Sequence, residues 1–263
     1  MEVHHHPHVE KKNFKEYFLE FLMIFLAVTL GFFAESLREH ISDNSKEHEY
    51  INALKKDLAA DTVNISTWMQ SFNSRIEEYD SLINMLRHPE NITDGGKLYY
   101  MSRITTRGTV FEDNNNTMTQ LNISGNFRLI RNKATTEKIV AYQNDIDNYK
   151  KINDYDSYEA RSLYEPQSKL FDAFVFNDMS KPIKDSAVNS SNTLLSGFRN
   201  IFTKPEGNPQ LLTTDKEKIN DFVYYLHQRR STFAAEIQIL YKQKQDAIAL
   251  IKLINDEYDL KNE

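Results

Sequence analysis

The stretch YFLEFLMIFLAVTLGFFAESL, residues 17–37, decides how this chain is built. Within it, the fourteen residues 21–34 carry neither a charge nor an amide. A helix that is apolar on every side must be surrounded by protein core or by lipid. Fourteen residues are too few to cross a bilayer, which takes about twenty. Apolar residues on both flanks extend the run to twenty-one, so we predict a single transmembrane helix over residues 17–37.

Three polar residues lie inside this predicted span: Glu20, Thr29 and Glu35. Carboxylates at membrane depth are costly and often functional. Glu20 and Glu35 lie near the two ends, where they can reach the membrane interface, and this is the interpretation we favour. The alternative is that Glu20, Thr29 and Glu35 line a ring of helices in an ion-conducting or ion-coupled assembly.

Small residues recur along one side of the same segment, at Ala27, Gly31 and Ala34. Small residues at a spacing of about four let two membrane helices approach closely. Self-association through this face is one interpretation. The other is that alanine and glycine are simply common in membrane spans.

The predicted tail, residues 1–16, reads MEVHHHPHVEKKNFKE. Neutral imidazoles are common ligands of transition metals, so a metal site is one interpretation of the histidines. The alternatives are a leftover purification tag and a polar tail at the lipid headgroups. The four candidate ligands are His4, His5, His6 and His8.

Charges around the span indicate its orientation. Three lysines precede it and two basic residues, Arg38 and Lys46, follow it, which favours a cytoplasmic N-terminus and an exterior C-terminal domain. The exit GFFAESLREH contains no A-x-A-like cleavage site, so we predict an uncleaved signal anchor in a bacterial cytoplasmic membrane, with the domain in the periplasm.

Composition limits the remaining choices. The chain of 263 residues has room for one sizeable domain beside the span, residues 38–263. Its net charge of −6 argues against a nucleic-acid partner, since DNA-binding proteins usually carry a basic excess. The absence of cysteine excludes disulfides and thiolate sites. Seven glycines and six prolines fit long helices better than a β architecture with many turns.

A long helix is predicted over residues 39–86, because no proline or glycine interrupts an apolar pattern with steps of three and four. The segment HPENITDGG, residues 88–96, should end it. Continuous with the span, this helix would form a stalk. Its predicted buried face comprises Ile51, Leu54, Leu58, Ile65, Met69, Phe72, Ile76, Tyr79, Ile83 and Leu86.

Residues 97–133 are the least regular part of the pattern, with strand and short-helix interpretations both open. A short helix within them is expected to begin at residues 115–117 and to stop at Gly125. A second long helix is expected over residues 134–164, and Pro166 should kink or end it. Its predicted buried stripe comprises Ile139, Tyr142, Ile146, Tyr149, Ile152, Tyr155 and Tyr158.

The connection over residues 177–213 is rich in Ser, Asn, Pro and Gly and should contain a short helix at 194–202. The last long helix is expected to start at residue 213 or 214, where Thr214 and Glu217 match a capping box, and to reach Tyr258. The fold class is therefore mainly α: one transmembrane helix followed by an elongated antiparallel bundle.

Motifs of catalysis are missing from the sequence. There is no HExxH, GxSxG, phosphate-binding loop or EF-hand pattern, and we predict neither an enzyme nor a cofactor. Arg229 and Arg230, beside His227, could receive an anion, but we favour the interpretation that they are exposed helical charges. The histidines of the domain are scattered singly along it, at His40, His48, His88 and His227.

Two segments, KEYFLEFLMIFLAVTLGFFAESLREH and TMTQLNISGNFRLIRN, resemble an uncharacterised family of single-span membrane proteins from Bacteroidota. The resemblance implies a membrane location and a helical exterior domain, and it brings no known activity. The second segment carries the "QL…SG…LIRN" signature of that family at Gln120, Leu121, Ser124, Gly125, Leu129, Ile130, Arg131 and Asn132.

These observations lead to a structural or interaction protein, anchored in the lipid bilayer, that forms a homo-oligomer or docks onto a protein partner. Two alternatives remain open. One is a sensor whose bundle takes a small ligand in a polar-lined internal pocket. The other is a subunit of the ion-conducting or ion-coupled assembly described above.

Overall fold

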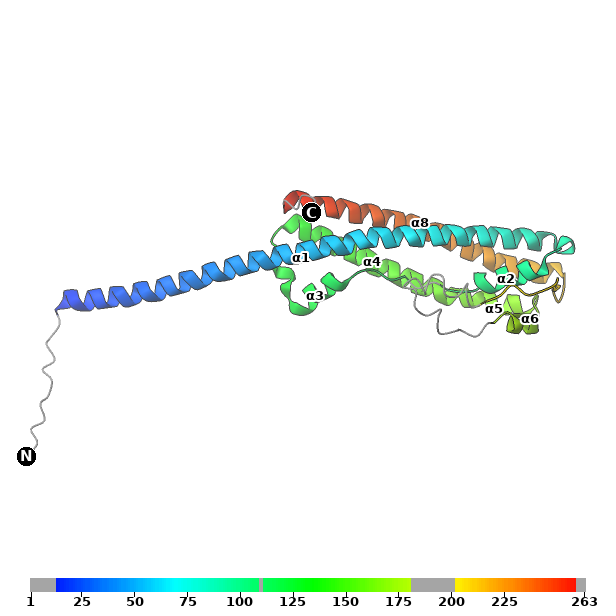
Figure 1. Ribbon diagram of the computed structural model, residues 1–263, viewed down its shortest axis with the longest axis horizontal. Helices are drawn as coiled ribbons and strands as arrows, with labels where there is room; N and C mark the ends of the chain where they lie inside the picture. The colour runs from blue at the N-terminus through cyan, green and yellow to red at the C-terminus, as the bar shows by residue number, and fades with distance from the viewer. Residues whose placement is uncertain (1–12, 109–110, 181–201, 259–263) are drawn as a thin grey trace, which may run out of the picture.

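The computed structural model describes residues 13–108, 111–180 and 202–258, and the elements of these residues are helical (Figure 1). In the described part of the chain, β pairing is limited to one isolated bridge between Ser180 and Phe202. The predicted mainly-α fold is confirmed. The longer helices are α1 (Phe14–Arg87), α2 (Gly95–Thr105), α3 (Asn116–Ser124), α4 (Lys133–Glu159) and α8 (Lys216–Glu257). The short ones are η1 (Pro89–Asn91), η2 (Asn126–Leu129), η3 (Ala160–Leu163), α5 (Tyr164–Ser168) and α6 (Ala173–Asp178).

Three long helices, α1, α4 and α8, form an elongated antiparallel bundle (Figure 1). Helix α8 runs antiparallel to α1, because the hydroxyl of Tyr258 donates to Glu47 at one end and Arg230 pairs with Asp80 toward the other. Helix α4 returns alongside α8. The fourth position is filled by α2 and α3, which lie toward opposite ends of the bundle (Figure 1).

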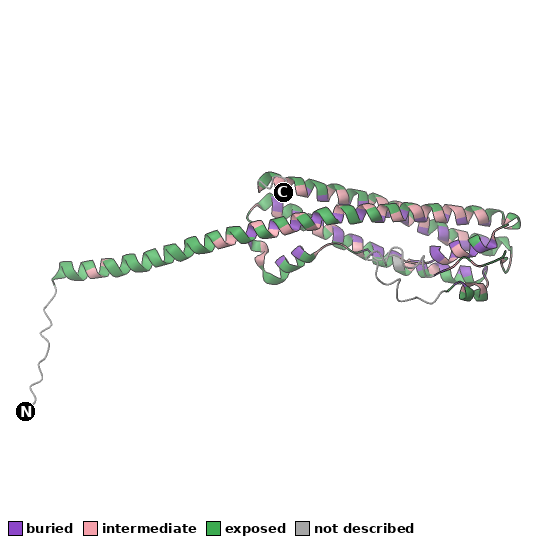
Figure 2. Ribbon diagram, in the orientation of Figure 1, coloured by how far each residue is buried: buried purple, intermediate pink, exposed green. Residues whose placement is uncertain are grey.

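Helix α1 is continuous over 74 residues, a length of about 110 Å at 1.5 Å per residue. From Phe14 to Lys46 none of its residues is buried, and this part projects bare from the bundle (Figure 2). The helix ends where predicted. His88 precedes Pro89, whose ring disfavours helical geometry for the residue before it.

Buried residues repeat with strictly alternating steps of three and four on all three long helices. This is the 3.5-residue repeat of a left-handed coiled coil, and the sequence pattern alone did not reveal it. On α1 the buried residues are Glu47, Ile51, Leu54, Leu58, Asp61, Ile65, Trp68, Phe72, Arg75, Tyr79, Leu82 and Leu86. On α8 they are Ile219, Phe222, Leu226, Arg229, Phe233, Glu236, Leu240, Gln243, Ala247, Leu250 and Ile254.

The heptad register corrects two predicted faces. On α1, Met69, Ile76 and Ile83 are only half-buried, while the buried positions beside them are Trp68, Arg75 and Leu82. On α4 the predicted stripe is right up to Tyr149 and then wrong: Tyr155 and Tyr158 are 66% and 63% exposed. Ile152 is exposed as well, and Asn153 and Asp156 are buried instead. Following apolar side chains alone led the prediction off the helix face, because polar side chains occupy some buried positions.

The shorter elements settle the open alternatives. Residues 95–105 form a helix and not a strand. Helix α3 begins after Asn115 and ends at Gly125, whose φ of 67° is left-handed, as expected for a glycine that stops a helix. The predicted short helix at 194–202 lies almost entirely outside the described residues.

Helix boundaries differ slightly from the predictions. Helix α4 ends at Glu159, and Pro166 lies inside the short helix α5. The cap of α8 is Asp215, one residue after the predicted Thr214, and its carboxylate accepts from the backbone N–H of Lys218 at 3.0 Å. A carboxylate caps a helix start at least as well as a hydroxyl does.

The start of α2 is pressed against the segment that leads into α8. The backbone N–H of Gly95 donates to Oδ1 of Asn208 at 2.6 Å, and a Cβ on Gly95 would collide with the carbonyl group of Pro209. We expect Gly95→Ala to lower the free energy of unfolding by about 1–3 kcal/mol, as overpacking does. Chemical denaturation followed by circular dichroism measures this. Asn148→Ala at an exposed position of α4 is the control; equal stability of the two variants would contradict the prediction.

Candidate functional site

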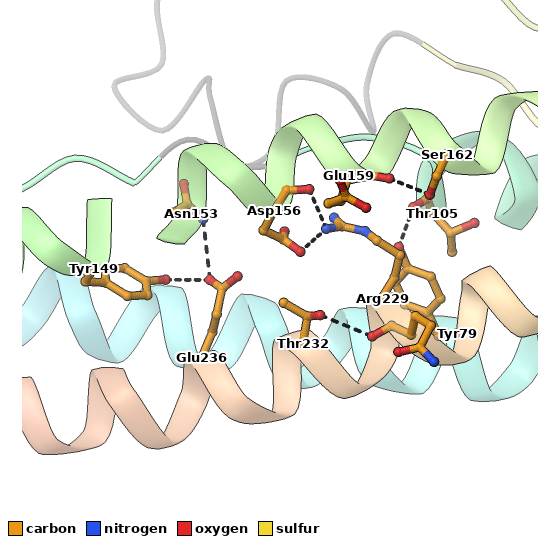
Figure 3. Close-up of polar contacts among 11 residues, drawn as sticks. Tyr79, Thr105, Tyr149, Asn153, Asp156, Glu159, Ser162, Arg229, Thr232 and Glu236 are labelled. Atoms are coloured by element: carbon orange, nitrogen blue, oxygen red, sulfur yellow. Dashed lines mark hydrogen bonds and ion pairs between the residues drawn. The ribbon is translucent and has the colours of Figure 1, made fainter. Parts of the chain in front are cut away.

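The candidate site is a buried polar centre in the middle of the bundle, where α1, α4 and α8 meet (Figure 3). Helix α8 places Arg229, Glu236 and Gln243 at successive heptad positions, seven residues apart. Their exposed fractions are 3%, 1% and 3%, so all three face the core. Exposed charge was expected for Arg229, and that prediction was wrong.

Arg229 forms an ion pair with Asp156 of α4, which is also 3% exposed. Its Nη1 donates to the carboxylate of Asp156 and, at 2.7 Å, to the backbone carbonyl of the same residue. The guanidinium carbon lies 5.0 Å from the centroid of the Phe233 ring. Burial raises the pKa of Asp156, and the charge of Arg229 opposes that rise without cancelling it.

Helix α1 contributes Arg75 and Tyr79 beside this pair. The hydroxyl of Tyr79 donates to the carbonyl of Thr105, and Nη1 of Arg75 donates to the carbonyl of Ile104 at 3.3 Å. Both acceptors lie at the C-terminal end of α2, where helix carbonyls lack partners within the helix. The centre therefore ties α2 to α1.

Glu236 lies two turns along α8 from Arg229. Its Oε2 accepts from the hydroxyl of Tyr149 at 2.7 Å and from Nδ2 of Asn153 at 3.4 Å (Figure 3). Oδ1 of Asn153 in turn accepts from the backbone N–H of Phe111 at 2.9 Å. Burial raises the pKa of Glu236 from 4.5 to about 6, and hydrogen bonds from Tyr149 and Asn153 limit the rise.

This shift makes stability depend on pH. When folding raises the pKa of a carboxyl, the native state holds the proton more tightly than the unfolded state does. The native state is therefore most stable when the group is protonated in both states, and it loses stability as the pH rises from the unfolded pKa through the folded pKa. A rise from 4.5 to about 6 corresponds to about 2 kcal/mol. Glutamine stays neutral at every pH, so Glu236→Gln should not lose this stability as the pH rises. We expect its free energy of unfolding, measured relative to wild type by urea unfolding, to be about 2 kcal/mol higher at pH 7.5 than at pH 4.5. The control is Glu49→Gln at an exposed site; a Glu236→Gln difference that stays constant with pH would contradict the prediction.

Two further buried carboxylates, Asp61 and Glu47, stabilise the end of the bundle from which the bare part of α1 projects. Asp61 accepts from the backbone N–H of Asn114 and from the hydroxyl of Tyr142, both at 2.9 Å. Glu47 accepts from the backbone N–H of Arg131 and from the hydroxyl of Tyr258, both at 2.8 Å. Each carboxylate joins α1 to segments far along the chain.

Polar residues at buried heptad positions specify the register and the partners of coiled-coil helices. The centre around Arg229 and Glu236 has this character, since both side chains bond to α4. Within the described part of the chain, other buried polar atoms of the centre have no hydrogen-bond partner: Nε and Nη2 of Arg229, Oδ2 of Asp156, Oε1 of Glu236 and Oε1 of Gln243. The pockets of the described residues are open grooves elsewhere. One lies where α1 ends and α8 begins, one lies between α4 and α8, and one lies between the middle of α1 and Lys244 of α8. A search of the same residues finds no cluster of three His, Cys, Asp or Glu that could hold a metal ion.

The bare part of α1 contains the predicted intramembrane residues. Thr29 donates to the carbonyl of Phe25 at 2.7 Å, and Glu35 forms an ion pair with Arg38 at 2.5 Å. Around a helix axis, Glu20 and Glu35 are about 60° apart, whereas Thr29 is about 180° from Glu20. A single helix therefore does not bring all three residues to one face.

The predicted helix-packing residues share one face, since Ala27, Gly31 and Ala34 lie within about 60° of one another around the axis. All three are exposed, and no atom of the described bundle approaches within 4 Å of a Cβ built on Gly31. The four histidines proposed as metal ligands, His4, His5, His6 and His8, lie outside the described residues.

Helix α1 contains a segment near its N-terminus that is long and apolar enough to cross a membrane. None of that segment is buried against the rest of the chain, in contrast to the core helix of a soluble protein (Figure 2). Comparison of the chain with protein-family models, curated proteins and solved structures finds no match.

Proposed function

We propose that this protein is a single-pass membrane-anchored structural or interaction protein, which oligomerises or docks onto a partner complex through its span and its helical domain. The observation that carries the proposal is the bare N-terminal part of α1. Large apolar side chains there, such as Phe21, Ile24 and Phe32, are 63–74% exposed. Exposing a large apolar side chain to water instead of burying it costs about 1.5–3 kcal/mol, so a row of them indicates lipid as their solvent.

The bundle then acts as a rigid spacer on this anchor. Ten residues of helix separate the end of the span at Leu37 from the first buried residue, Glu47, a distance of about 15 Å. From Glu47 to Arg87 helix α1 extends about 60 Å further, with α8 packed along it. The tip where α1 ends is therefore held about 75 Å from the edge of the hydrocarbon region.

The excess of basic residues before the span supports an N-terminus in the cytoplasm and a bundle in the periplasm of a bacterial inner membrane. The face of Ala27, Gly31 and Ala34 supports self-association, because small residues allow two helices to approach closely within lipid. In the single chain, no residue of the bundle that the structure describes covers that face.

The test is the mass of the full-length protein in mild detergent, beside that of residues 42–263. The shorter chain should keep its fold, because no residue from Phe14 to Lys46 is buried. We expect a defined oligomer or a complex with a partner for the full chain and a monomer for the fragment. A strict monomer that retains no partner on gentle purification would overturn the proposal.

A further inference from the structure

The end of the bundle farthest from the span carries a groove where α1 ends and α8 begins. It lies between the last turn of α1 and the first turns of α8, has a volume of about 800 Å³, and is open to solvent. We call it the tip groove. Its lining comes from residues 83–90 and 214–223.

The floor of the tip groove is apolar. Leu86 and Ile219 are buried, and Ile83 and Val223 are half-buried beside them. Each helix contributes two of these side chains, spaced by three or four residues, so two short apolar rows face the groove. Grooves of this kind accept the apolar side chains of a bound segment.

The rim of the tip groove is basic. Arg87 and Lys216 are exposed, and neither forms an ion pair with an acidic residue in the described ranges. The acidic residue in the lining is Glu90, which lies 3.5 Å from Nδ1 of His88. Asp215 and Glu217 are near in sequence but do not line the groove, and the carboxylate of Asp215 is engaged in capping α8.

We propose that the tip groove is a docking site for a short acidic segment of a partner protein. Apolar side chains of the segment enter between α1 and α8, and its carboxylates pair with Arg87 and Lys216. Charge complementarity of this kind selects partners and speeds their association. The open shape favours a peptide over an enclosed small ligand, and the position about 75 Å from the span excludes lipid as the occupant. The inference rests on the proposed interaction function and names the partner's chemistry.

The test uses the full-length protein in lipid nanodiscs and a displayed library of random 12-residue peptides. Wild type is compared with the charge-reversed variant Arg87→Glu/Lys216→Glu. The matched control is Lys151→Glu/Lys252→Glu, which changes the net charge equally at exposed positions outside the groove. Helix content from circular dichroism verifies that all three proteins are folded.

We expect wild type and the control to enrich peptides that combine Asp or Glu with Leu, Ile or Phe. An enriched peptide should bind the charge-reversed variant at least tenfold more weakly, and its affinity for wild type should fall with added salt. No enrichment, or enrichment that charge reversal leaves unchanged, would overturn the inference. Failure of the proposed function would be seen in a different experiment, the mass measurement in mild detergent, where the full-length protein would be a monomer without a partner.

Discussion

Replacing Arg229 with methionine is expected to lower the free energy of unfolding by about 3–5 kcal/mol, the cost of breaking a buried ion pair from one side. The substitution leaves the Asp156 carboxylate at 3% exposure without the guanidinium that neutralises it. Methionine keeps most of the apolar contact with Phe233. The loss of stability therefore comes mainly from removing the charge of the guanidinium and not from a change in side-chain volume. Chemical denaturation of the full-length protein in mild detergent measures the change.

Two further variants make the result interpretable. The double variant Arg229→Met/Asp156→Leu should recover most of the lost stability, because it removes both charges from the core. Arg230→Met provides a neighbouring control: Arg230 pairs with Asp80 at 2.8 Å, but both side chains are partly exposed. Such surface pairs contribute about 1 kcal/mol or less. Equal losses for Arg229→Met and Arg230→Met would show that the buried centre has no special energetic role.

The second large effect is expected in the membrane segment. Replacing Leu26 and Leu30, near the middle of the predicted span, with lysine should release the protein from the membrane fraction. A lysine at the centre of a membrane helix costs about 2.5–3.5 kcal/mol, and two lysines cost about 5–7 kcal/mol. The bundle should stay folded, since neither leucine contacts it. Fractionation of cells followed by alkaline extraction of the membranes measures the distribution.

The control for this change is Val63→Lys/Ile123→Lys on the bundle. Both side chains are exposed, at 65% and 83%, so the added charges stay in water and the protein should remain with the membranes. If the Leu26→Lys/Leu30→Lys protein also remained there, the apolar segment of α1 would not be the anchor. Retained helix content in both variants would show that the difference comes from the span.

Most of the architecture could be predicted from the sequence. The apolar run at residues 17–37, the absence of proline from residue 14 to residue 88 and the glycine at 125 predicted the length of α1, its end and the end of α3. These are local properties, because helix propensity and termination depend on neighbouring residues. The buried polar centre was missed for the opposite reason. Arg229 and Asp156 are 73 residues apart in sequence, and each alone reads as a surface charge.

One signal in the sequence could have revealed that centre. Arg229, Glu236 and Gln243 fall seven residues apart between the apolar heptad positions Leu226, Phe233, Leu240 and Ala247. A polar residue in phase with an apolar heptad lies in the core, whatever its charge. Had burial been assigned from the heptad spacing and not from polarity, Arg229 would have been placed in the core of the bundle. Tyr155 would have been placed on the exposed side of α4.

The sequence by itself determined the helices and the apolar N-terminal segment, because both follow from composition and periodicity along the chain. Only the tertiary structure decided which face of each helix is buried and which charges pair there. It alone also showed that the part of α1 before Glu47 extends out of the bundle with none of its residues buried. The physical reason is that burial and charge pairing depend on side chains brought together from distant parts of the chain. The energy of a buried charge is set by those neighbours and not by its own identity.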